Sequence, residues 1–237
     1  MGDHGPARPR ENRRVSCVVA AYNEAATIAA VVRGLHAHVP GLLEVIVVDD
    51  GSNDGTAEAA RQAGAVVVRR PRNDGKGAAI RDGLAAVRGD IVLMMDGDGQ
   101  DDPADAPRIL QALTEDVQMV IGSRFLGTFR EGAVTPLHRV GNRFLTWAFD
   151  RLYAQQLTDA QAGFRAFWTD AVAPERLSSR RYEVEADLNT LVALDGGRIV
   201  EVPVSRAART HGRSSFRSFY DGFRILAWML WRRVRSV

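Results

Sequence analysis

The most informative stretch of the chain is Ile91-Val92-Leu93-Met94-Met95-Asp96-Gly97-Asp98-Gly99-Gln100. Its leading apolar run is typical of a strand that is buried on both faces, as strands of parallel sheets are. Two carboxylates and two glycines follow at once, so the chain is able to turn sharply where the strand ends. Because ligands of open α/β sheets bind outside the carboxyl ends of the strands, the stretch predicts a central parallel strand with chemistry at its end.

The same pattern repeats on either side of this stretch. Short apolar runs alternate with helical periodicity from residue 15 to residue 123. Strands are expected at residues 15–21, 42–48, 65–68, 91–95 and 117–121, and helices at residues 23–38, 54–63, 77–87 and 103–114. This alternation predicts an α/β fold with a doubly wound, mainly parallel sheet and helices on both of its faces. Asp54 is the expected N-cap of the second helix.

Beyond Arg124 the regular alternation stops. We expect helices at residues 136–153 and 182–194, a mixed turn and strand at 158–168, a last strand at 198–204, and a C-terminal helix from residue 216. The apolar stretch of the last helix, residues 225–231, is too short to span a bilayer and is flanked by arginines. It indicates an amphipathic helix that lies on a membrane, on a partner or on its own domain.

The composition is that of a folded protein. Of the 237 residues, 46% are hydrophobic and 25% are charged, which excludes a disordered chain. The single cysteine, Cys17, excludes a disulfide framework within the chain and a cysteine-based metal cluster. No apolar run is long enough to span a bilayer, and residues 1–14 lack the apolar core of a secretion signal. The expected location is therefore cytoplasmic.

The charges are unevenly distributed. Residues 198–237 carry nine arginines against Glu201 and Asp221, a net charge of +7, and residues 1–14 carry +2. Since the whole chain carries +2, residues 15–197 carry −7. A basic tail on an acidic body favours anionic partners at the tail, either phosphates or a membrane surface. No nucleic-acid partner is expected.

Hard oxygen donors follow the central strand. Asp96 and Asp98, with Gln100 as a third donor, form a set that suits Mg²⁺ or Mn²⁺, ions that leave positions open for phosphates. The alternative is a solvated acidic turn before the next helix. A dinucleotide-binding loop is excluded because the turn after the first strand has no glycine. A P-loop is excluded because Gly75-Lys76-Gly77 lacks the Ser or Thr that should follow the lysine.

Two other strand ends carry polar groups whose roles stay open. Asp50 would hydrogen-bond a base or a ribose, or else Asp49 and Asp50 belong to the cap of the next helix. Lys76, the only lysine of the chain, would be a point charge for phosphate, a donor to a base, or a solvated side chain. Each group alone is a weak signal, whereas several at successive strand ends indicate a ligand site.

These groups lie in stretches that resemble family 2 glycosyltransferases with the GT-A fold. Within that family the chain most resembles the dolichol- or polyprenyl-phosphate sugar synthases, which transfer mannose or glucose. The similarity runs from about residue 15 to residue 230. The matching stretches are Val18-Val19-Ala20-Ala21-Tyr22-Asn23-Glu24, Val47-Val48-Asp49-Asp50-Gly51-Ser52, Asn73-Asp74-Gly75-Lys76-Gly77, Asp96-Gly97-Asp98-Gly99-Gln100-Asp101-Asp102-Pro103, Gly122-Ser123-Arg124, Arg139-Val140-Gly141-Asn142-Arg143, Thr158-Asp159 with Gly163-Phe164-Arg165, and Glu201-Val202-Pro203-Val204.

The resemblance implies three groups of site residues. The nucleotide sugar would be bound by Ala21, Tyr22, Glu24, Asp50, Asn73, Lys76, Asp96 and Arg213. The metal ion, Mg²⁺ or Mn²⁺, would be bound by Asp96, Asp98 and Gln100. The acceptor phosphate would be held by Arg124, Arg139 and Arg143.

The implied reaction is a displacement at the anomeric carbon, expected with inversion, in which a nucleotide diphosphate leaves. A lipid phosphate acceptor is already anionic at neutral pH, so an arginine cluster positions it and no strong base is required. An alcohol acceptor requires a carboxylate base. Asp159 lies where the family has its acidic active-site residue, although it is also suited to cap a turn. Glu183 and Glu185 are weaker candidates. The catalytic residues expected are Asp98 and Asp159.

The resemblance also implies a division of the chain. Residues 1–14 would be a flexible arm and residues 15–209 the catalytic domain, in which 15–123 bind the nucleotide sugar and 124–209 the acceptor. Residues 210–237 would form a basic lid segment and the amphipathic helix. Arg213 would fold over the donor diphosphate, with His211 as a second candidate. Relatives often have Gly-Ser-Lys where this chain has Arg213-Ser214-Ser215.

Three functions follow in order of preference. The first is a metal-dependent glycosyltransferase that acts on a polyprenyl phosphate as a peripheral protein at the cytoplasmic membrane face. The second is the same chemistry on a soluble acceptor in natural-product biosynthesis. The third is a non-catalytic module that binds nucleotides or lipids. The donor nucleotide is open between UDP and GDP.

Overall fold

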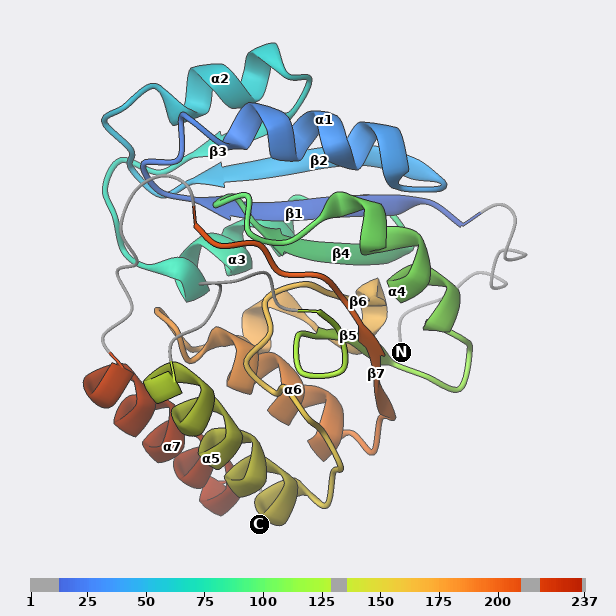
Figure 1. The fold of residues 1–237 in the computed structure, drawn as a ribbon, viewed down its shortest axis with the longest axis vertical. Coiled ribbons are helices and arrows are strands. Elements are labelled where there is room, and N and C mark those ends of the chain that lie inside the picture. Colours follow the sequence, from blue (N-terminus) through green and yellow to red (C-terminus); the bar gives the residue numbers. More distant parts are fainter. Residues whose placement is uncertain (1–12, 129–135, 210–217, 236–237) are drawn as a thin grey trace.

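The computed structural model describes residues 13–128, 136–209 and 218–235 (Figure 1). Within these residues one sheet has the strand order β3-β2-β1-β4-β6-β5-β7. The strands are β1 Val15–Ala21, β2 Leu42–Asp49, β3 Val66–Arg69, β4 Ile91–Asp96, β5 Met119–Ser123, β6 Arg165–Trp168 and β7 Ile199–Pro203. Only β6 runs antiparallel to its neighbours. The mainly parallel sheet expected from the sequence is confirmed.

Helices cover both faces of this sheet, as the alternating pattern predicts (Figure 1). They are α1 Ile28–His38, α2 Thr56–Gln62, α3 Lys76–Ala85, α4 Ala106–Ala112, α5 Pro136–Tyr153, α6 Val184–Leu194 and α7 Ser218–Arg235. The core on one face takes side chains from α1, α2 and α4, and the core on the other face takes them from α3, α5, α6 and α7. The C-terminal helix is thus present as expected.

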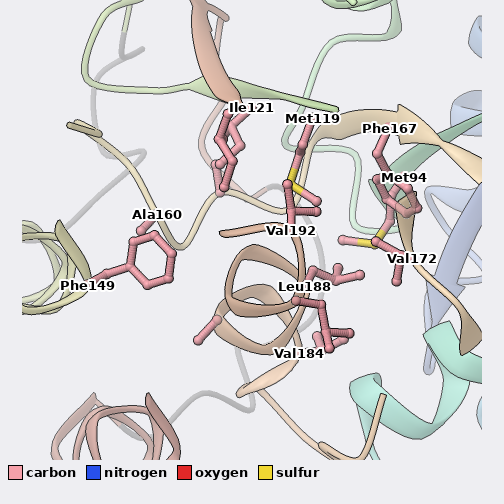
Figure 2. Packing of buried hydrophobic residues seen from close by; sticks show 14 of the residues in the cluster. Met94, Met119, Ile121, Phe149, Ala160, Phe167, Val172, Val184, Leu188 and Val192 are labelled. Carbon is pink, nitrogen blue, oxygen red and sulfur yellow. The ribbon is translucent and has the colours of Figure 1, made fainter. Parts of the chain in front are cut away.

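Successive residues of the central strands feed the two cores alternately. Met94 and Met119 lie on the side of α6, where Figure 2 shows them near Leu188 and Val192. Leu93 and Met95 belong to the opposite core with α1 and α4. Because both faces of β4 are buried in this way, its sequence is a continuous apolar run rather than an alternating one.

Several helix boundaries differ from the expectation by a few residues, and the starts of α1 and α2 have a local cause. The first helix starts at Ile28 and not near Asn23, because Asn23 has a left-handed φ of 55° and its N–H donates to the Ser52 hydroxyl. The carboxylate of Asp54 accepts hydrogen bonds from the N–H and hydroxyl of Thr56, but the cap position itself is Gly55, with a φ of 90°. Asp54 therefore acts from one residue before the cap.

The C-terminal helix packs on its own domain through one face. Ile225 and Met229 are buried in the core shared with α5 and α6. The Tyr153 hydroxyl at the end of α5 donates to the Met229 carbonyl at 2.6 Å. The opposite face of α7 is exposed. Within the described ranges, no helix combines the length and the apolar character needed to cross a bilayer.

The predicted arm and lid are described only at their margins. Residues 1–12 and 210–217, including His211 and Arg213, lie outside the described residues. Arg13, which the sequence analysis placed in the arm, holds its guanidinium 4.5 Å from the Trp168 ring centre and 2.9 Å from the Glu115 carboxylate.

We expect Gly83→Ala to destabilise the fold. A Cβ on Gly83 would lie 2.6 Å from a Val18 methyl and 2.9 Å from a Val48 methyl, so α3 would have to move away from the sheet. Overpacking of this kind costs about 1–3 kcal/mol of unfolding free energy. Urea denaturation measures it. The matched control is Gly141→Ala on α5, where a Cβ meets nothing within 4 Å and helix propensity should add about 0.5–1 kcal/mol of stability. Equal effects of the two substitutions would contradict the packing argument.

Candidate active site

The carboxyl ends of three parallel strands meet at one edge of the sheet. In the ladder Ala20 pairs with Asp96, and Ala21 pairs with Asp49. Beyond the ladder, the N–H of Asp50 donates to the Ala21 carbonyl and the N–H of Gly97 donates to the Ala20 carbonyl. These bonds hold the predicted site residues at the ends of β1, β2 and β4 in one place.

Asp50 organises the loop that leads into α3. Its carboxylate accepts from the N–H groups of Asp74 at 3.2 Å and Gly75 at 2.8 Å, and the Arg70 guanidinium lies 3.4 Å away. Burial raises the pKa of Asp50 although these bonds oppose the shift. The loop brings exposed Asn73 to the same edge as Asp50. A pocket beside this loop is lined by Gly51, Ser52, Asn53, Arg69, Arg70 and Pro71.

Lys76 lies between two carboxylates. Its ammonium is 2.6 Å from an Asp96 oxygen at the end of β4 and 2.6 Å from a Glu185 oxygen on α6. Burial alone would lower the pKa of Lys76, but the two carboxylates raise it above its usual value. Lys76 in turn holds the pKa of Asp96 below its usual range, against the effect of burial. A Cβ at Gly163 would lie 2.9 Å from Asp96 and 3.2 Å from the ammonium, so this cluster requires a glycine there.

Asp98 is held by an arginine that the sequence analysis did not select. One nitrogen of Arg209 lies 2.6 Å from an Asp98 oxygen, and another lies 2.9 Å from a Glu24 oxygen. Burial, followed by the charge of Asp96, raises the pKa of Asp98 to about 6. The buried position therefore disfavours the charged form of Asp98, although Arg209 contacts it.

A second arginine holds the other oxygen donors of this turn. Arg206 donates to Asp101 at 2.7 Å and to the side-chain oxygen of Gln100 at 2.9 Å. The second Asp101 oxygen is buried without a hydrogen-bond partner. The turn is thus a set of carboxylate and amide oxygens that attracts cations.

This donor set fits a hard divalent ion. Asp96, Asp98 and Gln100 would supply oxygen ligands, as Mg²⁺ and Mn²⁺ prefer. Within the described ranges, no three His, Cys, Asp or Glu side chains converge where they could hold a metal. The protein would supply only part of the coordination sphere, and the remaining ligands would come from water or phosphate oxygens.

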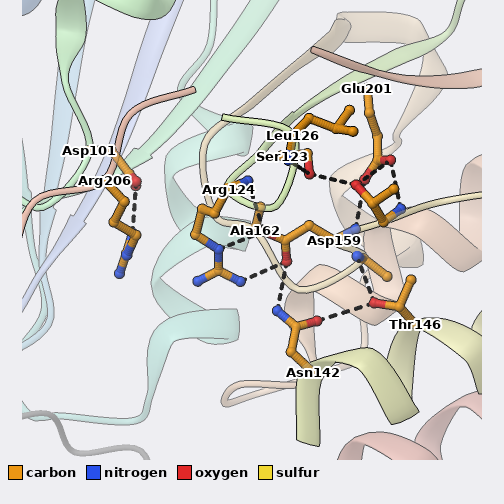
Figure 3. A network of polar contacts seen from close by, with 12 residues as sticks. Asp101, Ser123, Arg124, Leu126, Asn142, Thr146, Asp159, Ala162, Glu201 and Arg206 are labelled. Carbon is orange, nitrogen blue, oxygen red and sulfur yellow. Dashed lines mark hydrogen bonds and ion pairs between the residues drawn. The ribbon is translucent and has the colours of Figure 1, made fainter. Parts of the chain in front are cut away.

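A second polar cluster surrounds Asp159 (Figure 3). The Asp159 carboxylate is fully buried and accepts from the Arg124 side chain at 2.6 and 2.7 Å, from the Arg124 N–H at 3.1 Å and from the Asn142 amide at 2.7 Å. The Asp159 N–H donates to Glu201 at 2.8 Å. Burial would raise the pKa of Asp159, but Arg124 and Asn142 lower it below its usual range. Asp159 is a fixed anion that orients the Arg124 guanidinium.

Arg165 holds the segment between Asp159 and Gly163, which connects the two clusters. This side chain is fully buried and donates to the Asn189 side chain at 2.6 Å and to the Ala162 carbonyl. Burial lowers the pKa of Arg165 to about 10. The three successive residues thus have different roles. Gly163 leaves room for Lys76 and Asp96, Phe164 packs in the core, and Arg165 hydrogen-bonds the preceding loop at Ala162.

The remaining predicted residues are spread over two helices. Arg139 and Arg143 lie exposed on α5, and Asn142 between them is the residue that reaches Asp159. Glu183, the residue just before α6, is 2.6 Å from Arg224, and Glu185 on α6 is the partner of Lys76. Both glutamates that were considered as bases are therefore held in ion pairs.

Sequence reasoning missed Asn142, Arg206 and Arg209 as site residues. Asn142 lies within a stretch that resembles the family, but nothing local distinguishes it from its arginine neighbours. Arg206 and Arg209 lie in the basic C-terminal region, more than 100 residues along the chain from Asp98 and Asp101. The excess positive charge of that region was the available signal, and it selected no single arginine.

Comparisons with known proteins identify relatives of this chain. A sequence model described as glycosyl transferase family 2 matches residues 16–173. Glycosyltransferase AglJ of Haloferax volcanii is 38% identical over 192 residues, which are 81% of this chain but 62% of AglJ. Undecaprenyl-phosphate mannosyltransferase of Micrococcus luteus is 33% identical over 85% of this chain and 86% of its own.

Solved structures share the fold. Glucosyl-3-phosphoglycerate synthase of Mycobacterium tuberculosis in complex with phosphoglyceric acid has a TM-score of 0.73 and 26% identity, over 98% of this chain and 86% of that one. The same enzyme with Mn²⁺, UDP and glucosyl-3-phosphoglycerate has a TM-score of 0.71 and 26% identity, over 97% of this chain and 85% of that one.

We expect Asp98→Asn to stabilise the metal-free protein at neutral pH. The pKa of Asp98 is raised in the native state to about 6. The native state therefore binds a proton more tightly than the unfolded state, and the carboxylate becomes increasingly destabilising as pH rises from about 4 to about 6. Asparagine removes this penalty, worth up to about 3 kcal/mol above pH 6.

Urea denaturation with a chelator, repeated between pH 4 and pH 7.5, measures the difference. The stability gain of Asp98→Asn should grow with pH and then level off. Asp116→Asn, on an exposed carboxylate paired with Arg198, is the control and should show no such gain. A gain that instead grows toward low pH would contradict the assignment of the shift.

Proposed function

The chain belongs to glycosyl transferase family 2 and is a GT-A glycosyltransferase, and we propose that it moves a sugar from a nucleotide diphosphate sugar to a polyprenyl phosphate in a metal-dependent, inverting reaction. The observation that carries the proposal is the Asp159–Arg124 pair. Both Asp159 oxygens are engaged, so the cluster presents a positioned cation rather than a free base.

The state of the other carboxylates supports a phosphate acceptor. Asp96 and Glu185 are paired with Lys76, Asp98 with Arg209, and Glu183 with Arg224. An alcohol nucleophile needs a base that accepts its proton, whereas a phosphate oxygen is already anionic. The similarity to a mannosyltransferase that acts on undecaprenyl phosphate supports the same acceptor class.

The proposed division of roles follows the two clusters. Ala21, Tyr22, Glu24, Asp50 and Asn73 lie at the strand edge where a nucleoside would bind. Mg²⁺ or Mn²⁺, when bound by Asp96, Asp98 and Gln100, would neutralise charge on the leaving diphosphate. Arg206 and Arg209 add positive charge beside the same oxygens, and Arg213 of the undescribed segment would complete the lid.

The acceptor would bind on the Asp159 side. Arg124 is fixed by Asp159, and we assign Arg139 and Arg143 of α5 to the same phosphate. The phosphate oxygen attacks the anomeric carbon, the bond from that carbon to the donor diphosphate breaks, and the nucleotide diphosphate leaves with the bonding electrons. Positioning two anions against each other is the main task of these arginines.

A soluble acceptor is the second candidate function. The observation that favours it is the likeness, over 98% of this chain, to a synthase solved with phosphoglyceric acid, a small anionic molecule. The same arginine cluster would then hold a soluble phosphate group. The two candidates share the donor half of the site and differ in what lies beyond Arg124.

We expect nucleotide diphosphate release to depend on both a metal and a prenyl phosphate. The assay uses UDP- and GDP-linked mannose and glucose with Mn²⁺ or Mg²⁺, with and without a short polyprenyl phosphate. Chelation should lower the rate at least about 100-fold, because the ion stabilises the leaving group by several kcal/mol. Release that proceeds equally well without the lipid, and faster with phosphoglyceric acid, would favour the soluble acceptor.

We expect Arg124→Lys to impair use of the acceptor selectively. Lysine keeps the charge but loses the two-point contact with Asp159, so the cation is no longer oriented. The KM for prenyl phosphate should rise on the order of 10- to 100-fold while the donor KM stays within about twofold. Arg198→Lys, in an exposed pair with Asp116, is the matched control. An equal rise of both KM values would remove Arg124 from the acceptor site.

A further inference from the structure

Most of the exposed large apolar side chains lie on two helices. The part of the chain that the structure describes has eleven of them, and eight belong to α5 or α7. These eight are Val140, Phe144, Trp147, Tyr220, Phe223, Leu230, Trp231 and Val234. We call this set the α5–α7 face. Exposed apolar surface concentrated in this way marks an interaction site.

The two helices form one outer layer of the domain. They lie side by side in Figure 1, and the Tyr153 hydroxyl of α5 bonds the Met229 carbonyl of α7. Helical spacing places Phe223, Leu230 and Val234 opposite the buried Ile225 and Met229. The apolar residues of the face are therefore surplus to the packing of the domain.

The charges that border the face have one sign. In the described parts of α5 and α7, every exposed charged residue is an arginine, namely Arg139, Arg143, Arg151, Arg233 and Arg235. The acidic residues of the two helices, Asp150 and Asp221, are not exposed. The face thus combines apolar rings with a fringe of positive charge.

Aromatic rings and guanidinium groups contact each other along the face. The Arg235 guanidinium lies 4.4 Å from the Trp231 ring centre, and the Phe144 and Trp147 rings stack at 6.0 Å. Trp, Tyr and Arg are the side chains that favour the headgroup region of a bilayer, where one end is apolar and the other is hydrated.

We propose that the α5–α7 face is a docking surface for an anionic lipid bilayer. This proposal deepens the proposed function and rests on it for the identity of the acceptor. It extends the expected membrane contact from the C-terminal helix to α5 and defines the residues involved. Positive charge attracts anionic lipid headgroups, and exposed rings enter the interface. A second copy of the chain would bring the same arginines together, so like charges oppose a symmetric dimer through this face.

The docked orientation places the acceptor site next to the lipid. Arg139 and Arg143 lie on α5 beside Asn142, which contacts Asp159. The inner side of α7 is tied to α6 by Arg224 with Glu183 and by Arg232 with Asp187, both at 2.6 Å. These ion pairs therefore connect the face to α6, the helix that carries Glu185, the partner of Lys76.

Vesicle flotation tests the proposal with the full chain and no prenyl phosphate. We expect binding to phosphatidylcholine vesicles that contain about one third phosphatidylglycerol, and at least about tenfold weaker binding to phosphatidylcholine alone. High salt should reduce the binding to anionic vesicles. Equal or absent binding to both vesicle types would overturn the proposal.

Variants identify the surface. Trp147→Ser combined with Phe223→Ser removes two exposed rings, and Arg151→Glu combined with Arg233→Glu reverses charge outside the assigned acceptor site. Each pair should lower vesicle binding about tenfold or more. The control is Val66→Ser, which replaces an exposed apolar residue on β3, away from the face. If the protein is a dimer in solution and the Trp147→Ser, Phe223→Ser variant (the ring variant) dissociates it, the face binds a second copy of the chain, and the lipid proposal is overturned.

A soluble, short-chain prenyl phosphate separates this proposal from the proposed function. Release of nucleotide diphosphate with that acceptor, without vesicles, should survive in the ring variant. If the wild type shows this release but ignores vesicles, the docking surface fails while the function stands. If it binds anionic vesicles but release never depends on prenyl phosphate, the function fails while the docking surface stands.

Discussion

The rest of the site depends on the two ion pairs of the Lys76 ammonium. This ammonium joins the end of β4, through Asp96, to the first turn of α6, through Glu185, with 2.6 Å to each carboxylate. Removing one member of such a cluster would leave a largely buried charge without a partner, which is costly. Gly163 must lack a side chain for the contact to form, and Asp50 must hold the loop that leads to Lys76. The relative positions of the end of β4, the loop before Lys76 and α6 thus depend on the Lys76 ammonium.

The site contains several ion pairs between arginines and buried carboxylates. Arg124 neutralises Asp159, Arg209 neutralises Asp98, and Arg206 neutralises Asp101. Burial, followed by the charge of Asp96, nevertheless raises the pKa of Asp98 at the turn after β4. If the site receives an ion and a diphosphate, as we propose, it is expected to be less stable empty than a site optimised for folding. The pairs also orient guanidinium groups in advance, so less has to be ordered when an anion arrives.

Helix α6 links this interior to the outer layer. Glu185 contacts Lys76, whereas Glu183, just before the helix, and Asp187 in its first turn pair with Arg224 and Arg232 of α7. Carboxylates at a helix N-terminus are also favoured by the helix dipole. One short acidic segment therefore fixes the catalytic edge and the C-terminal helix relative to each other. These ion pairs attach the inner side of α7 to the domain, whereas its outer face is apolar and exposed.

The sequence alone determined the strands, most helix positions and the edge at which the site lies, because apolar runs and turn residues act locally. It also selected Asp96, Asp98 and Gln100, which lie within five residues of each other. Only the tertiary structure decided the antiparallel course of β6, the partners of Lys76, and the pairing of Arg206 and Arg209 with residues more than 100 positions away. Such contacts are fixed by how the chain returns to the sheet, and no local pattern records which of thirty arginines arrives there.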